Sequence, residues 1–372
     1  MIHGTTAIDV DSHVEEDEAT WNYLDPEYAA RRPIILNARG QAGLTQYDAF
    51  WMVDGRTWPK PVGHGAMVAA TPPVSTRALN KPYSVGSQSL ADMEARIGDL
   101  DRLGLDVQVL FPTIFLLPLT EDLAFEAALM SSYNRWIAER CSQHADRLKW
   151  VAVLPWRSPA AAVEELRRAQ EQGAIGVATL GTIGPRMLHE PEFDPIWAEA
   201  ERLDLPVGVH TGWPHPGLNA SCDTMWAAHV LSFTVPVMMG FFSVLGGGVL
   251  DRHPGLRVGF FEAGADWLPF MLQRMEHYYG GDGAPGMGRV SAQRPSKYVE
   301  RGQVYFTCEG DEALLPQVLT FLGDDYMMAS GDVPHAEARD NCMEEIAERE
   351  DISEEQKRKI LGENARRFYK LK

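Results

Sequence analysis

The stretch Ile8-Asp9-Val10-Asp11-Ser12-His13-Val14-Glu15 is where the fold and the chemistry of this chain begin. An apolar, β-prone segment, residues 5–10, runs here into acidic residues and a histidine. Asp11 and His13 are two positions apart, so on a strand their side chains point to the same face. A carboxylate and an imidazole directed together suit a divalent metal. The alternative is a surface turn after a strand, because Asp-x-His also arises by chance.

Composition and charge restrict the class of protein. Of the 372 residues, 45% are hydrophobic and 23% charged, which is typical of a soluble globular protein. The chain has no run of about 18 apolar residues and no basic-then-apolar leader, so we expect a cytoplasmic protein without a membrane span. A formal net charge of −18 argues against nucleic acid or an anionic membrane as a partner. We therefore expect a small-molecule substrate.

Seven further apolar segments, each followed by helical spacing, predict the rest of the sheet. They are residues 107–111, 148–154, 175–180, 206–210, 257–262, 304–307 and 326–329. Near-continuous apolar strands that alternate with helices indicate a parallel sheet buried on both faces. Eight such units favour a (β/α)₈ TIM barrel of the α/β class, spanning residues 1–372 as one domain. A doubly wound open sheet is the alternative, although no glycine-rich nucleotide motif follows any strand.

Two segments depart from this alternation. Residues 16–90 are rich in Pro, Gly and aromatic residues and lack clear periodicity, which predicts an irregular, packed insertion after the first strand. Residues 353–369 form a C-terminal helix, for which Ser353-Glu354-Glu355-Gln356 is a capping box.

The carboxyl ends of barrel strands are where catalytic residues lie. Five of the eight predicted ends carry His, Asp or Glu, a mixture that a divalent metal prefers. These residues are Asp11, His13, His210, Glu262, Glu309 and Asp332.

Three of these motifs together resemble the amidohydrolase superfamily: Asp-x-His after the first strand, a lone His210 after the fifth, and Ser330-Gly331-Asp332-Val333-Pro334-His335 after the eighth. Residues 253–270 and 359–369 are similar to the sixth strand and closing helix of one branch. That branch includes aminocarboxymuconate-semialdehyde decarboxylase and the resorcylate-type decarboxylases. The resemblance covers nearly the whole chain apart from about residues 20–90.

The resemblance implies a set of metal ligands, namely Asp11, His13, His210 and Asp332. These side chains can hold one ion of Zn²⁺, Fe²⁺ or Mn²⁺ and leave a position open for water. Core hydrogen bonding for His210 and helix capping for Asp332 are the alternatives. Members of the branch are often dimers, so we expect a homodimer, for which the helix face of residues 339–348 is a candidate.

Two features depart from the branch pattern. Decarboxylases of the branch usually carry a catalytic His after the sixth strand, where this chain has Glu262, and Glu309 adds a carboxylate after the seventh. Thr179 stands where many amidohydrolases have a carbamylated Lys, so a carbamate-bridged pair of metals is not expected. The two glutamates are candidates to hold a second metal or to act as general base. An ion pair with Arg157 is the alternative.

Weaker candidates surround this set. His229 follows the fifth strand and is a candidate for acid–base or substrate-binding work, with a buried structural histidine as the alternative. His335 is expected to orient Asp332, or otherwise to begin a helix. The loop after the fifth strand adds three candidate pocket residues, Trp213, His215 and Trp226.

Three functions follow from these residues. The first hypothesis is a metal-dependent hydrolase of an ester, thioester or amide of a bulky apolar acid, with Asp332, Glu262 or Glu309 as base. The alternative is a non-oxidative decarboxylase of an aromatic or unsaturated acid, with Asp332 as the acid that protonates carbon. A non-catalytic binding protein is the third, disfavoured by the intact ligand set.

Overall fold

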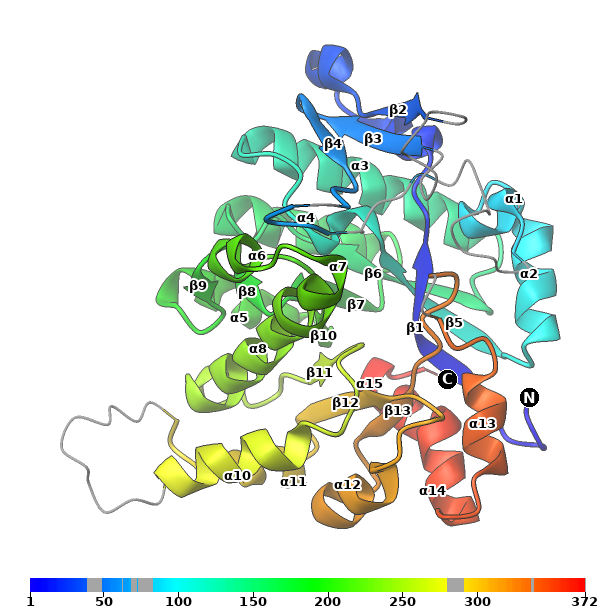
Figure 1. Ribbon diagram of the computed structural model, residues 1–372, viewed down its shortest axis with the longest axis vertical. Helices are drawn as coiled ribbons and strands as arrows, with labels where there is room; N and C mark the ends of the chain where they lie inside the picture. The colour runs from blue at the N-terminus through cyan, green and yellow to red at the C-terminus, as the bar shows by residue number, and fades with distance from the viewer. Residues whose placement is uncertain are drawn as a thin grey trace.

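The computed structural model describes residues 1–38, 49–61, 63–67, 72, 83–279, 291–335 and 338–371. Its centre is an eight-stranded sheet with the strand order β1-β5-β6-β7-β10-β11-β12-β13, in which every neighbouring pair is parallel (Figure 1). The strands are β1 Ile8–Val14, β5 Val107–Pro112, β6 Leu148–Val153, β7 Gly176–Leu180, β10 Val207–His210, β11 Val258–Phe260, β12 Val304–Cys308 and β13 Met327–Ala329. The predicted TIM barrel is confirmed.

The barrel is closed by the segment that follows β13. Asp332 N donates a hydrogen bond to Asp11 O at 2.9 Å, and His13 N donates to Val333 O at 2.7 Å. Gly331 allows this approach, because a Cβ at its position would lie 2.7 Å from Asp9 Oδ2. The first and last strands of the sheet therefore meet at their carboxyl ends through backbone hydrogen bonds.

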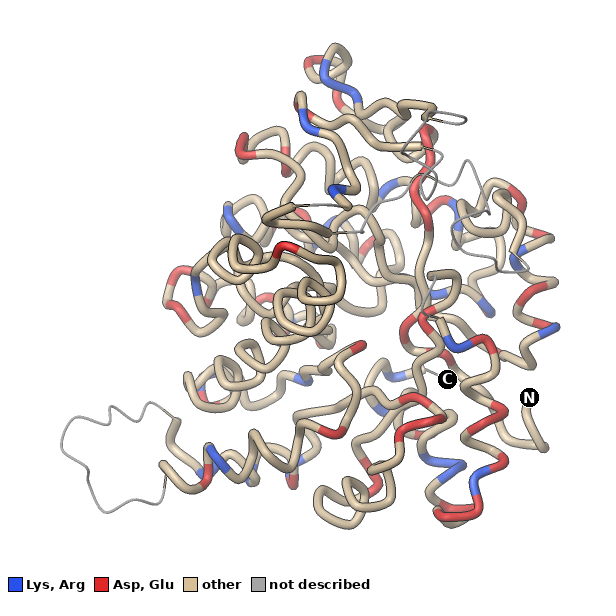
Figure 2. The backbone as a smooth tube through the Cα atoms, in the orientation of Figure 1, with Lys and Arg blue, Asp and Glu red and all other residues tan. Residues whose placement is uncertain are grey.

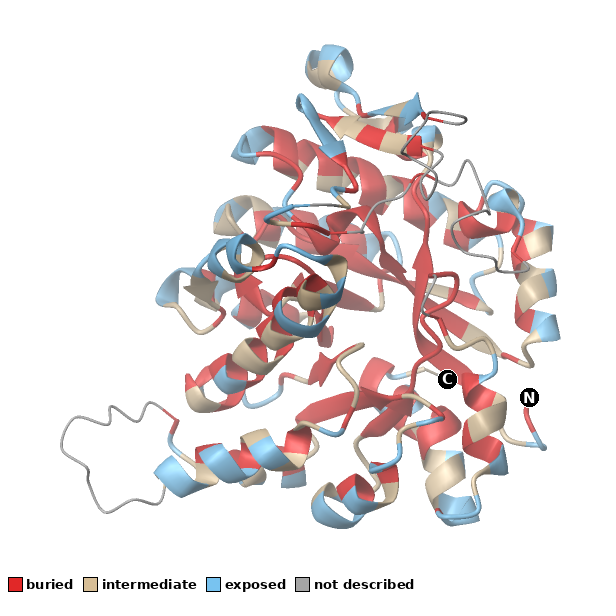
Figure 3. Ribbon diagram, in the orientation of Figure 1, coloured by how far each residue is buried: buried red, intermediate tan, exposed pale blue. Residues whose placement is uncertain are grey.

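Helices cover the outside of the sheet, as the buried strands require (Figure 3). Carboxylates begin two of them: Asp92 accepts from Ala95 N at 3.0 Å, and Asp122 accepts from Ala124 N at 3.1 Å. The larger ones are α2 Met93–Arg102, α3 Leu123–Ser142, α4 Pro159–Glu171, α5 Asp194–Arg202, α8 Val235–Gly246, α10 Leu268–Tyr279, α12 Leu315–Leu322 and α13 Cys342–Glu348. Shorter ones are α1 Val85–Gln88, α6 Pro216–Ser221, α7 Met225–Ala227, α9 Val249–Arg252 and α11 Pro295–Glu300.

The closing helix contains a π-helical turn. It consists of α14 Glu354–Arg358, the turn η6 Lys359–Glu363 and α15 Asn364–Tyr369. Its predicted capping box is present, because Gln356 N donates to Ser353 Oγ at 3.2 Å and Ser353 N donates to Gln356 Oε1 at 2.8 Å.

The insertion is more regular than the sequence predicts. Its described part contains a three-stranded antiparallel sheet of β2 Ile34–Asn37, β3 Ala49–Val53 and β4 Arg56–Trp58, which lies beyond one end of the barrel strands (Figure 1). Two 3₁₀ helices, η1 Glu18–Tyr23 and η2 Pro26–Arg31, precede it. These strands are too short to show a clear period-two alternation of apolar residues, so the proline and glycine content of the segment predicts an irregular structure.

One helical stretch, Met225–Gly246, is long and apolar enough to cross a membrane by length and composition alone. In the structure 56% of its 18-residue window is buried inside the protein, as in the core helix of a soluble protein. It comprises α7, the π-helical turn η5 Ala228–Phe233 and α8. Acidic residues accompany basic ones over the outer helices in the described chain (Figure 2).

Candidate metal centre

The first two candidate ligands come from β1 itself. The sequence placed the strand end at Val10, but β1 continues to Val14, so Asp11 and His13 lie within it. Its pairing register with β5 shifts between Asp9 and Ser12, where β1 carries one extra residue. The Asp9 carboxylate stabilises this bulge. It accepts hydrogen bonds from Asp11 N at 3.2 Å, Ser12 Oγ at 2.6 Å and Gly331 N at 3.0 Å.

His13 is fully buried and oriented from both sides. Its Nδ1 lies 3.0 Å from Pro112 O, and because a carbonyl only accepts, Nδ1 carries the proton. Arg96 Nη2 donates to His13 O at 3.0 Å. His13 Nε2 faces Asp332 Oδ1 at 3.3 Å and Asp11 Oδ1 at 3.6 Å, and has no hydrogen-bond partner among the described residues. Burial, and then the nearby histidines, lower the pKa of His13 well below its ordinary value.

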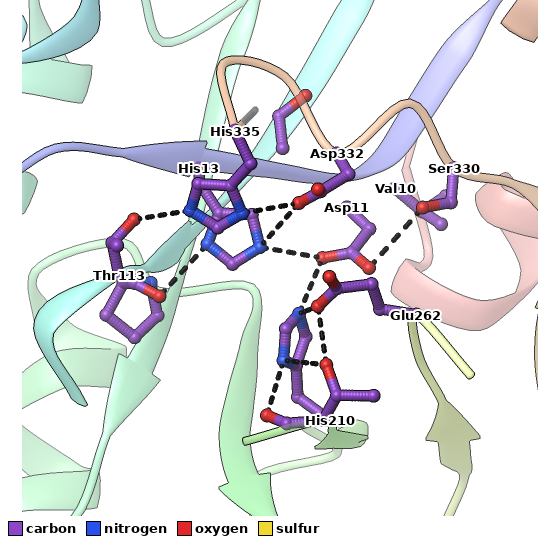
Figure 4. A network of polar contacts seen from close by, with 12 residues as sticks. Val10, Asp11, His13, Thr113, His210, Glu262, Ser330, Asp332 and His335 are labelled. Atoms are coloured by element: carbon purple, nitrogen blue, oxygen red, sulfur yellow. Dashed lines mark hydrogen bonds and ion pairs between the residues drawn. The ribbon is translucent and has the colours of Figure 1, made fainter. Parts of the chain in front are cut away.

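His210 repeats this arrangement at the end of β10. Its Nδ1 donates to Thr211 O at 2.9 Å, which leaves Nε2 directed at Asp11 Oδ1 at 3.1 Å and Glu262 Oε2 at 3.3 Å (Figure 4). Burial disfavours the charged ring, but the Asp11 carboxylate and then Glu262 raise the pKa of His210 above its ordinary value. The ring is thus set between two carboxylates.

Two of the acidic residues stand in left-handed backbone conformations, with φ of 57° at Glu262 and 54° at Asp332. Such values are uncommon outside glycine and concentrate at functional sites. Glu262 Oε2 accepts from Thr211 Oγ1 at 2.5 Å, and Glu262 N donates to Thr307 Oγ1 at 3.0 Å. Burial, and then Asp332, raise the pKa of Glu262 well above its ordinary value.

Asp332 and His335 form a close pair. His335 Nδ1 lies 2.8 Å from Asp332 Oδ1, and His335 Nε2 lies 2.8 Å from Thr113 Oγ1 (Figure 4). The Thr113 hydroxyl donates its proton to Val14 O at 2.8 Å, so it accepts from His335 Nε2. His335 Nδ1 and Asp332 Oδ1 therefore face each other either across a shared proton or beside a bound cation. The expected role of His335 in orienting Asp332 stays a prediction.

This set of donors fits a divalent cation. The ligand atoms of Asp11, His13 and His210 lie within 4.8 Å of one another, as do those of His13, Asp332 and His335. Both central imidazoles use Nδ1 on backbone carbonyls and turn Nε2 towards carboxylate oxygens, an arrangement that is repulsive between neutral rings and carboxylates unless a cation lies among them. The residues that would hold the metal are Asp11, His13, His210 and Asp332, with Glu262 at their edge.

The remaining candidates lie outside this cluster. Glu309 is half-buried and donates its backbone N–H to Glu312 Oε1 at 2.8 Å, and among the described residues no hydrogen bond or ion pair joins its side chain to the cluster. Burial, and then Asp311 and Asp11, raise the pKa of Glu309 above its ordinary value. His215 caps α6 by accepting from Leu218 N at 3.2 Å. Trp213 is buried, and its ring packs edge-on against His229 at 5.6 Å, while Trp226 is 79% exposed. Their functional roles stay predictions.

The sequence gives no role to several residues that hydrogen-bond the candidate metal ligands. Thr113, Thr211 and Thr307 each follow or end a strand and each hydrogen-bonds a member of the cluster or its backbone. Their position at strand ends was the available signal, since Thr113 follows Pro112 and Thr211 follows His210. Arg96 could not be found in this way, because in the sequence it resembles any charged residue on the surface of a helix. In the structure it is 1% exposed and donates a hydrogen bond to His13 O.

A cavity opens beside His210 at the carboxyl ends of β5, β6, β7 and β10. Most of its walls are apolar and buried, with Phe111, Phe115, Leu116, Leu154 and Trp156 among them. The charged residues in its wall are Glu126 and Arg157, which pair through Arg157 Nη2 and Glu126 Oε1 at 2.6 Å. Of the predicted pocket residues, Trp213, His215 and Trp226 do not line this cavity, although Pro214 does.

Comparison with known proteins shows the family to which the chain belongs. Residues 58–371 match the amidohydrolase family model, so the chain belongs to that family. The gamma-resorcylate decarboxylase of Rhodococcus jostii (strain RHA1) is 30% identical over 64% of this chain and 75% of its own. The 2-amino-3-carboxymuconate-6-semialdehyde decarboxylase of Dictyostelium discoideum is 26% identical over 85% of this chain and 89% of its own. The resemblance predicted from the motifs is confirmed.

Solved structures agree on the fold. A Mycobacterium avium subsp. paratuberculosis K-10 amidohydrolase superposes with a TM-score of 0.77 at 20% identity, over 99% of both chains. The 5-carboxyvanillate decarboxylase of Novosphingobium aromaticivorans DSM 12444, complexed with manganese and 4-hydroxy-3-methoxy-5-nitrobenzoic acid, gives 0.72 at 21% identity, over 99% of this chain and 97% of its own. Both likenesses confirm the barrel fold over nearly the whole chain.

The comparisons contradict the first functional hypothesis. Both curated relatives are decarboxylases, so the expected hydrolysis of an ester, thioester or amide is wrong, and the decarboxylase alternative is favoured. The sequence favours hydrolysis because Glu262 and Glu309 each follow a barrel strand and could activate water. Only Glu262 joins the cluster, and its neighbours Thr211 and His210 account for its place there. The homodimer and the cytoplasmic location stay predictions.

Proposed function

We propose that this chain is a metal-dependent, non-oxidative decarboxylase of an aromatic or unsaturated carboxylic acid. The observation that carries the proposal is the buried His13 Nε2, which faces two carboxylates without a hydrogen bond, next to a largely apolar cavity that reaches His210. A metal held there would bind the substrate carboxylate and a neighbouring hydroxyl and draw electron density from the ring. Manganese is our first choice, since a related fold carries it, followed by zinc and iron.

The reaction needs one proton, because the carbon that loses carbon dioxide must gain a hydrogen. In this proposal the proton is shared across the 2.8 Å contact between Asp332 and His335, and the Thr113 hydroxyl keeps His335 in place. Asp332 can therefore deliver this proton to carbon, and His335 can restore it. Glu262 stands where the branch has a catalytic histidine, with its Oε2 3.3 Å from His210 Nε2. Asp11, His13, His210 and Asp332 are buried, which limits the access of water to the carbanion-like carbon.

The test is carbon dioxide release by the metal-loaded protein from a panel of hydroxybenzoates, with aryl esters and thioesters in parallel. We expect release from at least one hydroxybenzoate and no cleavage of the esters. Asp332→Asn should abolish release, whereas Asp311→Asn, which changes an exposed carboxylate paired with Arg339, should not. Ester or thioester cleavage without carbon dioxide would overturn the proposal.

A further inference from the structure

Arg96 is a buried cation that the proposed reaction does not use. It lies on α2 and is 1% exposed. Among the described residues no ion pair joins it to a carboxylate, and its hydrogen bonds go to neutral oxygen atoms. A buried charge without a counter-charge is costly, and a guanidinium does not lose its proton in proteins. An arginine at this position therefore needs a reason other than the filling of space.

The guanidinium joins three segments of the chain. Arg96 Nη2 donates to His13 O on β1 at 3.0 Å, and Arg96 Nε donates to Gln108 Oε1 on β5 at 3.0 Å. Arg96 Nη1 lies 3.5 Å from Ser87 O on α1, where the chain returns from the insertion. Because the N–H groups of a guanidinium form a planar, rigid fork, these contacts fix the His13 carbonyl relative to β5.

The contact with His13 lies where the sheet alone does not determine the path of the strand. The register between β1 and β5 shifts between Asp9 and Ser12, immediately before His13. A bulge disrupts the ladder locally and changes the direction of the side chains near it. Asp9 stabilises the bulge itself, whereas Arg96 holds the strand just beyond it.

His13 is held at three points. Its backbone N–H donates to Val333 O at 2.7 Å, its carbonyl oxygen accepts from Arg96, and its ring Nδ1 donates to Pro112 O at 3.0 Å. The remaining ring nitrogen, Nε2, faces two carboxylates (Figure 4). Of these three partners, Arg96 is the one that contributes a side chain, so its contact can be removed by substitution.

We propose that Arg96 is a positioning residue of the metal centre, which fixes the main chain of His13 so that Nε2 points at the metal. Arg96 acts through His13, because a guanidinium has no lone pair with which to bind a cation. The metal gains from the position of its ligand and not from the charge of Arg96. This inference rests on the proposed function, since it takes the cluster around His13 as the metal centre.

Metal affinity tests this role without any turnover. Arg96→Met removes the three contacts, so we expect the affinity for Mn²⁺, measured by competition with a chelator, to fall about ten- to hundredfold. Loss of a positive charge by itself would strengthen the binding of a cation, so a weaker affinity identifies the loss of position. The electron paramagnetic resonance spectrum of the bound Mn²⁺ should change as well. Unchanged or tighter binding would overturn the proposal.

Asn134→Leu is the matched control. Asn134 is fully buried on α3 and holds the backbone of another barrel strand, because its Nδ2 donates to Val153 O at 2.9 Å and its Oδ1 accepts from Val153 N at 3.0 Å. Its loss should lower the free energy of unfolding, as Arg96→Met does, but leave the affinity and the spectrum of Mn²⁺ unchanged. An equal loss of affinity in this control would assign the effect to general loosening of the barrel and overturn the proposal.

Arg96→Lys separates geometry from charge, and it also serves if Arg96→Met does not fold. The substituted side chain keeps the charge, but its single nitrogen cannot span His13 O and Gln108 Oε1 as the fork does. We expect an affinity for Mn²⁺ between those of the unchanged protein and Arg96→Met. An affinity equal to that of the unchanged protein would show that the fork is not needed and would overturn the proposal.

The outcomes also separate this inference from the proposed reaction. Equal binding of Mn²⁺ by the unchanged protein and by Arg96→Met would contradict only the role of Arg96. The expected order of affinities without carbon dioxide release from any hydroxybenzoate would contradict the proposed reaction and support the role of Arg96. Failure of the unchanged protein to bind Mn²⁺ would contradict both.

Discussion

The backbone N–H of Asp332 donates a 2.9 Å hydrogen bond to the carbonyl oxygen of Asp11, which joins the first and last candidate ligands of the chain. The positions of both side chains are therefore fixed by the backbone before any ion binds. Asp332 makes this hydrogen bond from a left-handed backbone conformation, with φ of 54°. A centre built in this way loses little conformational entropy when it takes up a metal, which favours tight binding.

Metal content separates the ligands from their neighbours. Asp332→Asn removes a carboxylate that lies 3.3 Å from His13 Nε2, so bound metal should fall from about one ion per chain to near zero after dialysis. Glu309→Gln should leave the metal content unchanged, because Glu309 lies outside the cluster. Elemental analysis measures both. Near two ions in the unchanged protein, falling to one in the Glu309 variant, would instead make Glu309 a ligand of a second metal.

Loss of the Thr113 hydroxyl should weaken proton delivery. Thr113→Val leaves His335 Nε2 without its 2.8 Å partner, so we expect kcat for decarboxylation to fall about tenfold while metal content is retained. Thr120→Val is the control, because Thr120 is equally buried but bonds Asp54 at 2.6 Å. Equal losses of kcat in both variants would show a general effect on stability.

Glu262 should tune the metal through charge. Glu262→Gln keeps an acceptor for Thr211 but removes the negative charge 3.3 Å from His210 Nε2. We expect metal affinity to fall about ten- to hundredfold, measured by competition with a chelator. Glu262→His, which introduces the residue usual in the branch, should restore part of the carbon dioxide release lost in the Gln variant. Unchanged affinity in the Gln variant would place Glu262 outside the metal environment.

Stability of the metal-free protein should depend on pH through Glu16. Glu16 is 1% exposed, and burial raises its pKa from 4.5 to about 7, although Thr113 N and Ile114 N donate to it. Between pH 4.5 and about 7 the folded protein therefore holds a proton that the unfolded chain releases. The free energy of unfolding falls as pH rises through this window, by about 3 kcal/mol for this group.

Urea unfolding at several pH values measures that slope. Glu16→Gln should flatten it between about pH 5 and about pH 7, because the amide does not titrate. Glu18→Gln, at an exposed position nearby, should leave the slope as it is. An identical slope in all three proteins would assign the dependence to other groups.

The sequence predicts correctly those parts of the fold that depend on neighbouring residues alone. Apolar strands such as residues 206–210 and 304–307 stand out, because parallel strands are buried on both faces. Strand ends then place His210 and Asp332 at the same edge of the barrel. The extra residue in β1 could not be predicted, since it depends on Asp9 reaching Gly331 from the other end of the chain.

The functional error has a physical reason as well. Glu262 and Glu309 look alike in sequence, each following a barrel strand. The backbone places them differently. Glu262 has a left-handed conformation, with φ of 57°, and its side chain faces the candidate metal centre, whereas Glu309 N donates a hydrogen bond to the Glu312 side chain.

The closure of the barrel has a consequence for how the protein is made. A ribosome delivers Asp11 and His13 first, but Asp332 only after nearly the whole chain has emerged. The two backbone hydrogen bonds between β1 and the segment after β13 can form only then, so the newborn chain cannot build a complete metal site part-way through synthesis. On the proposed function, the metal therefore binds only after synthesis is complete, and a polypeptide truncated before Asp332 lacks one of the candidate ligands.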